Sequence, residues 1–225
     1  MKQEKEGSAV KWLNRLERAI GRHYIPNLMK YLCFAMAGVF CLDYLYLSGF
    51  LTRSASSLLV FDKERILQGE VWRVISFIFL PPNHSFLFIL LSLYFYFFLG
   101  TALENHWGSA RFNIYYAIGI LGNIAAGFLM GYATNYFLNL SLMLALAVLY
   151  PEMEIMLFFV IPVKLKWIGW LDGALLIYEF VIASWPVRLA LVLSLLPFIL
   201  FFGQQAWLQM RMDGRRLLRW IRTKQ

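Results

Sequence analysis

The sequence contains few charged residues, few histidines and only two cysteines. Charged residues make up 15% of its 225 positions, whereas hydrophobic residues make up 60%. Ordinary soluble domains carry about 25% charged residues, so this composition excludes that class and indicates an integral membrane protein. Cys33 and Cys41 lie eight positions apart. On one helix this spacing separates them by about 12 Å, which is too far for a disulfide bond.

The sequence also lacks the motifs that bind common cofactors. It has no phosphate-binding loop, no nucleotide fingerprint and no cluster of metal-ligating residues, so we predict no cofactor and no metal site. The net charge of +8 comes largely from lysine and arginine near the two ends of the sequence, next to apolar segments. Anionic lipid headgroups are the nearer partner for such clusters, so we predict contact with the bilayer surface and no binding of nucleic acid.

Apolar runs predict an all-α integral membrane protein with one domain of six transmembrane helices. An amphipathic helix within residues 1–26 precedes this domain, which covers residues 27–206, and a basic amphipathic tail follows at 207–225. Six crossings place both termini on the same side, and the positive-inside rule predicts that this side is cytoplasmic. We predict a bacterial inner membrane as the location. The six predicted spans are 27–50, 84–103, 112–133, 136–150, 168–184 and 187–206.

Two of these spans have unusual features. The fourth has 15 residues, or about 22 Å of helix against about 30 Å of hydrocarbon, so neighbouring helices must shield it or the bilayer must thin around it. The third contains four glycines that predict close approach of another helix backbone. These are Gly119, Gly122, Gly127 and Gly131. The short apolar segment at 71–80 is predicted to be interfacial or re-entrant.

Two motifs resemble the rhomboid superfamily, which implies a six-helix rhomboid-like bundle over about residues 27–205. The first is the Trp72–Arg73 pair, and the second is the set Glu104, Gly108 and Arg111 after the second span. Physically, the indole of Trp72 is expected at headgroup depth, and the guanidinium of Arg73 can hold a phosphate or a carbonyl-rich turn. Glu104 and Arg111 are expected to pair across the short turn between the second and third spans.

The catalytic residues of active rhomboids are only partly matched. Those proteins are similar to one another in a glycine-flanked serine on helix four, a histidine on helix six, and a histidine with an asparagine on helix two. Ser141 has a suitable depth on the fourth span but leucine neighbours, and no histidine follows His106. His84 lies near the helix-two position, but Phe88 replaces the asparagine. A serine without a base is a poor nucleophile.

The resemblance therefore implies a pseudoprotease, and the aromatic second span is similar to that of the derlins. Such a protein would bind transmembrane or lipid-embedded partners through the gap beside its short fourth helix. Two alternatives stay open: an intramembrane serine protease that uses Ser141 with a non-standard base, and a small membrane transporter. His84, Ser141 and Glu179 are candidates for an intramembrane polar site, because ionisable groups inside a membrane often have functions. Glu179 is expected to snorkel or to pair with an arginine such as Arg73 or Arg188.

Overall fold

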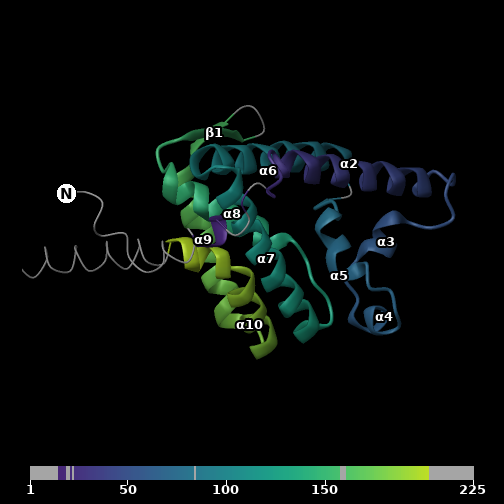
Figure 1. The fold of residues 1–225 in the computed structure, drawn as a ribbon. Coiled ribbons are helices and arrows are strands. Elements are labelled where there is room, and N and C mark those ends of the chain that lie inside the picture. The colour runs from purple at the N-terminus through teal and green to yellow at the C-terminus, as the bar shows by residue number, and fades with distance from the viewer. Residues whose placement is uncertain (1–14, 19–20, 22, 84, 158–160, 203–225) are drawn as a thin grey trace, which may run out of the picture.

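The structure is a computed structural model, and it describes residues 15–18, 21, 23–83, 85–157 and 161–202. The described part is mostly helical (Figure 1). Residues 15–18 are helical, as expected for the N-terminal amphipathic segment, whereas the tail at 207–225 lies outside the described residues. The elements are α2 (Leu28–Leu47), α3 (Ala55–Leu59), α4 (Lys63–Leu67), α5 (Arg73–Ser76), the 3-10 helix η1 (Phe77–Phe79), α6 (Phe86–Trp107), α7 (Ser109–Met130), α8 (Tyr136–Leu149), β1 (Glu154–Leu157), β2 (Ile161–Lys164), α9 (Leu165–Ile182) and α10 (Trp185–Ser194).

A helix occupies each region that was predicted to span, but fewer than six helices are suited to crossing a membrane. Within the described residues, α2, α6 and α7 are long and apolar enough. A fourth span results if α10 is joined to the following helical turn at 196–202, from which it is bent by 49°. The prediction of six spans is therefore too high by this measure. With 14 residues α8 is short, and α9 carries Lys166, Asp172 and Glu179 within its 18 residues.

The short helix α8 forms the centre of the helical assembly. It contacts α6, α7, α9 and α10, and most of its side chains are buried, including Leu138, Leu142 and Leu146. In Figure 1, α2 lies beside α6, and α7 lies beside α10. Neighbouring helices therefore shield α8 on several sides, which is the first of the two outcomes expected for so short a helix.

Of the four glycines that were predicted to lie against another helix backbone, Gly122 does so, while Gly119 and Gly127 lie against side chains. A Cβ atom at Gly122 would collide with the backbone carbonyl of Leu193 on α10, and one at Gly119 would collide with the side chain of Leu138 on α8. A Cβ at Gly127 would lie 2.8 Å from the ring of Phe61. Gly131 has a different role, because it ends α7 with a φ of 89° that favours glycine.

The segment between α2 and α6 is held by Asp43 of α2 near its beginning and by buried residues of η1 near its end. Asp43 near the end of α2 is buried, and its carboxylate accepts hydrogen bonds from the Ser54 hydroxyl (2.8 Å) and from the backbone N–H of Ser56 (3.1 Å). These bonds fix the start of α3. The predicted interfacial segment at 71–80 folds as α5 and η1, of which Phe77 and Ile78 are buried against the helical core.

One element departs from the all-α prediction. Strands β1 and β2 form an antiparallel hairpin in which Glu154 is opposite Lys164. The hairpin lies in an apolar stretch rich in β-branched and aromatic residues, a composition that favours strands over helices. It connects α8 to α9.

Candidate functional site

Arg73 lies at the centre of a buried hydrogen-bond network. Its side chain is fully buried, and its Nη1 donates to the carbonyls of Ser57 and Val60, each at 2.9 Å. Its Nε donates to the carboxylate of Glu70 at 2.5 Å. Because the last carbonyls of a helix have no partner within it, Arg73 satisfies the end of α3. Of the two roles expected for this guanidinium, holding a carbonyl-rich turn is the one observed.

The residues beside Arg73 complete the same contact. Trp72 is half-exposed, and its Nε1 donates to the carbonyl of Leu58 at 3.2 Å. The hydroxyl of Ser76 donates to the carbonyl of Leu59 at 2.9 Å. Three side chains of residues 72–76 therefore bind successive carbonyls at the end of α3, so the first motif acts here as an architectural clamp. The depth of the Trp72 indole in a bilayer stays a prediction.

The second motif is also architectural, but its expected ion pair is wrong. Glu104 is buried, and its Oε1 accepts hydrogen bonds from the backbone N–H of Asn27 (2.8 Å) and from the hydroxyl of Ser109 (2.5 Å). Arg111 instead pairs with Glu17 at 3.0 Å between Nε and Oε2. The acid thus ties the start of α2 to the α6–α7 turn, and the base ties α7 to the N-terminal segment.

Gly108 makes that turn possible. It lies between α6 and α7 with a φ of 84° and a ψ of 154°, a conformation that residues with a side chain rarely adopt. Its backbone N–H donates to the carbonyl of Glu104 at 2.8 Å. The glycine of the motif therefore allows the sharp reversal that brings Glu104 and Ser109 together.

Ser141 is closed off from any substrate. It is fully buried, and its hydroxyl donates to the carbonyl of Leu138 at 2.7 Å. The phenol of Tyr115 donates to the Ser141 hydroxyl at 3.1 Å and to the Ser141 carbonyl at 3.0 Å. Neither of these groups is a base that could remove the serine proton. Ser141 is therefore a packing residue that joins α8 to α7.

The candidate bases lie in other contacts. Nδ1 of His106 lies 2.8 Å from the phenol oxygen of Tyr150, and the ammonium groups of Lys164 and Lys166 both bind Glu152, at 2.8 Å and 2.7 Å. His84 lies outside the described residues. In the described part of the chain, Ser141 thus has no imidazole or amine among its hydrogen-bond partners.

Glu179 does not form the expected ion pair with an arginine. Its Oε2 is buried and has no hydrogen-bond partner. Arg73 binds Glu70, while Arg188 donates from Nη2 to the carbonyl of Val181 at 2.8 Å. Glu179 lines a cavity of about 280 Å³ between α7, α8, α9, α10 and the loop before α8. Of the three candidates for an intramembrane polar site, the structure therefore separates Glu179 from Ser141.

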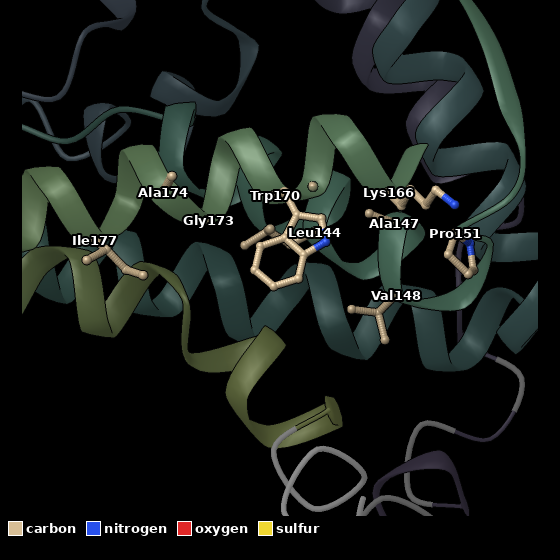
Figure 2. A pocket seen from close by; sticks show the side chains of 10 residues that line it. Leu144, Ala147, Val148, Pro151, Lys166, Trp170, Gly173, Ala174 and Ile177 are labelled. Atoms are coloured by element: carbon tan, nitrogen blue, oxygen red, sulfur yellow. The ribbon is translucent and has the colours of Figure 1, made fainter. Parts of the chain in front are cut away.

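A second, larger hollow of about 470 Å³ lies between α8 and α9 (Figure 2). Ala174 and Ile177 lie toward one end, Pro151 and Lys166 toward the other, and Trp170 between them. It is lined by Leu144, Ala147, Val148, Pro151, Lys166, Gly169, Trp170, Gly173, Ala174 and Ile177. We call this hollow the α8–α9 groove, and its walls are almost wholly apolar.

Two glycines on α9 divide the α8–α9 groove into a closed and an open part. A Cβ at Gly169 would lie 2.6 Å from the Cβ of Ala147, whereas a Cβ at Gly173 would meet no atom within 4 Å. The side chains of Trp170 and Ile177 next to it are largely exposed. One turn beyond the contact with α8, the surface of α9 therefore stays open.

A charged cluster borders the α8–α9 groove at Lys166. Glu152 accepts hydrogen bonds from Lys164 and Lys166, and these bonds lower the pKa of its carboxyl from 4.5 to about 2. The same contact raises the pKa of Lys164. All three side chains are at least partly exposed, so solvent screens the cluster and it holds the hairpin only weakly.

One polar contact of α7 was not predicted from the sequence. Asn123 is buried, and its Oδ1 accepts a hydrogen bond from the buried hydroxyl of Ser194 on α10 at 2.5 Å. The signal available in the sequence was an asparagine next to Gly122 in an otherwise apolar run, since a polar side chain beside a helix-packing glycine often bonds across the interface.

Within the described residues, no group of three or more His, Cys, Asp or Glu side chains is arranged to hold a metal ion. No known protein family matches the chain, and no curated protein is significantly similar to it.

Proposed function

We propose that this membrane protein binds the transmembrane helix of a partner protein in the α8–α9 groove and does not cleave it. The open surface at Gly173 is the observation that carries this proposal, because it offers a helix surface without a side chain in a place that no described residue fills. In a bilayer, helices associate through close packing at such small residues rather than through burial from water.

The spacing of small residues on α9 favours a helix as the occupant. Gly169 and Gly173 are four positions apart, which is the spacing that lets two helix backbones approach closely. Ala147 of α8 uses Gly169 in this way. A partner helix would use Gly173 in the same way, with Trp170 and Ile177 on either side of it as apolar contacts.

The state of Ser141 supports binding without cleavage. Its hydroxyl is buried and bonded to Leu138, and its other polar neighbour is Tyr115. The protease alternative requires the serine to leave both contacts and to find a base. The non-catalytic alternative requires no such rearrangement.

The relationship to rhomboids and derlins is part of the same proposal. It rests on the two motifs, whose residues form the clamp at α3 and the turn between α6 and α7. An arrangement with both termini in the cytoplasm and a bacterial inner membrane as the location belongs to it as well. In that arrangement, α8 would cross a bilayer only where α6, α7, α9 and α10 shield it.

Crosslinking in reconstituted membranes tests the proposal. A photoreactive phenylalanine analogue replaces Trp170, and the probe is a labelled single-span peptide of leucine and alanine with glycine at every fourth position. We expect an adduct with the intact peptide. Gly173→Leu should reduce the adduct by about tenfold or more. A tenfold change in affinity corresponds to about 1.4 kcal/mol, which is less than the free energy that one well-packed side chain contributes.

Gly38→Leu is the matched control, since a Cβ at Gly38 on α2 also meets no atom within 4 Å. This variant should keep the adduct. Equal adduct formation in the Gly173→Leu variant, or capture of lipid in place of peptide, would overturn the proposal. A cleaved peptide would overturn its non-catalytic part.

A further inference from the structure

The cavity beside Glu179 is a polar site that the proposed groove does not include. Its volume is about 280 Å³, and no residue that lines it also lines the α8–α9 groove. Side chains come from α7, α8, α9, α10 and the loop at 131–135. This volume is near the lower end of known ligand sites, so it suits a small molecule or a single headgroup.

Two buried polar atoms at this cavity have no partner. They are Oε2 of Glu179, which accepts hydrogen bonds, and Nδ2 of Asn123, which donates them. The other polar atom of the Asn123 amide is satisfied, because it accepts from Ser194. A buried polar group without a hydrogen bond costs about 1–3 kcal/mol, and a charged one costs more. The cavity therefore offers one negative acceptor and one donor to a ligand.

Aromatic rings complete the lining. Tyr132, Tyr136 and Phe137 all border the cavity, and the rings of Tyr136 and Phe137 meet edge to face with centroids 5.3 Å apart. Aromatic faces attract cations, most strongly when solvent is excluded. A carboxylate combined with these rings therefore favours an organic ammonium ion.

In the described part of the chain, Arg188 of α10 does not pair with Glu179. Its Nη2 donates to the carbonyl of Val181, and its guanidinium lies 5.8 Å from the ring centre of Phe180, while its Nε is buried and has no hydrogen-bond partner. A hard metal ion is a poorer match for the lining, because it requires several oxygen ligands and tolerates an apolar wall badly. A cation supplied from outside the chain would complement Glu179.

We propose that this cavity binds a small primary ammonium ion that also carries a hydrogen-bond acceptor, as in ethanolamine and its phosphate esters. The ammonium group lies against Glu179 and the aromatic rings, and the oxygen of the ligand accepts from Nδ2 of Asn123. A free amine and an ethanolamine lipid headgroup share this chemistry. The proposal uses residues separate from those of the α8–α9 groove, so either can fail without the other.

Thermal unfolding of the full-length protein in detergent tests it, with ethanolammonium chloride as the probe. We expect the melting temperature to rise with probe concentration in the wild type. In Glu179→Gln, which has nearly the same shape but no charge, the apparent affinity should fall by about tenfold or more. Glu64→Gln removes an exposed acid of α4 and should leave the affinity unchanged.

Two further measurements test whether binding depends on the charges of Glu179 and of the ammonium group. Glu179→Asp retains the charge and should weaken binding less than Glu179→Gln does. Ethylene glycol, which lacks the ammonium group, should not shift the melting temperature. Binding that persists in Glu179→Gln, an equal shift with ethylene glycol, or an equal shift with sodium chloride would overturn the proposal. In nanodiscs, a larger shift with phosphatidylethanolamine than with free ethanolamine would assign the site to lipid, and the reverse would assign it to a soluble amine.

Discussion

Arg73 and Glu179 are both charged side chains in an apolar fold, but they differ in their hydrogen-bond partners. Arg73 binds two carbonyls and a carboxylate, whereas Oε2 of Glu179 binds no described group. Isolated buried charges are costly, so folds usually supply partners for those that serve architecture alone. Arg73 is bonded through Nη1 and Nε, although its Nη2 has no hydrogen-bond partner among the described residues, whereas the Glu179 carboxyl borders a cavity that leaves room for another molecule.

The glycines repeat this difference between the two regions. The backbone of α10 occupies the space beside Gly122 of α7, whereas the space beside Gly173 of α9 is open. We call residues 55–131 the closed region, because neighbouring atoms fill the space beside Gly119, Gly122 and Gly127, and Arg73 and Glu104 form several hydrogen bonds there. The region from α8 to α10 is open at Gly173 and at Glu179. The α8–α9 groove lies within it, and the Glu179 cavity lies between it, α7 and the loop at 131–135.

The largest expected effect on stability comes from removing the Arg73 side chain in the closed region. Arg73→Ala removes two bonds to the end of α3 and leaves the Glu70 carboxylate unpaired, so we expect a loss of about 3–5 kcal/mol in the free energy of unfolding. Reversible unfolding in mixed detergent micelles measures this change. Arg65→Ala is the control, because Arg65 forms an exposed ion pair with Asp62, which contributes at most about 1 kcal/mol. Equal losses in the two variants would contradict the comparison.

The second prediction compares the two glycines directly. Gly122→Ala forces α7 away from the Leu193 carbonyl and should destabilise the protein by about 1–3 kcal/mol. Gly173→Ala has free space and a better helix former, so it should be neutral or stabilising by up to about 1 kcal/mol. The same unfolding measurement checks both variants. A similar loss at Gly173 would show that the α8–α9 groove is filled by the chain itself.

The closed region was also the part that the sequence predicted best. Apolar runs located α6 and α7 but not α3 or α4. The glycine pattern predicted close packing at four positions, and the structure has it at Gly119, Gly122 and Gly127 but not at Gly131. The Glu104–Arg111 pair was wrong because Glu17, the actual partner of Arg111, is 94 positions away from it. No local pattern reports such a contact.

The open region was predicted only in outline. The shortness of α8 indicated a gap beside it, but which residues of α9 line that gap depends on how α9 is rotated against α8. Gly173 could not be distinguished from Gly169 by sequence, although one is open and the other is in contact. Likewise, the sequence indicated Glu179 as a candidate polar residue but did not reveal its cavity. That cavity is formed by four helices and a loop, so no local sequence pattern predicts it.

The third prediction concerns Ser141, at the boundary of the two regions. Ser141→Ala removes the hydroxyl but keeps the Ser141 carbonyl that Tyr115 also binds, so we expect a loss of only about 0.5–1.5 kcal/mol. Peptide capture at the α8–α9 groove should be unchanged. A serine-directed phosphonate should label neither protein. Labelling of the wild type that disappears in Ser141→Ala would restore the protease alternative.

The smallest effect is expected at Glu152, whose charge is paired like that of Arg73 but exposed to solvent. Hydrogen bonds from Lys164 and Lys166 lower its pKa from 4.5 to about 2. A carboxyl with a lowered pKa in the folded state stabilises the fold above pH 4.5, and this contribution is lost as the pH falls toward 2. Melting temperatures of wild type and Glu152→Gln should therefore differ slightly above pH 4.5 and converge near pH 2. A difference that stays constant over this range would show that the pairing does not hold the hairpin.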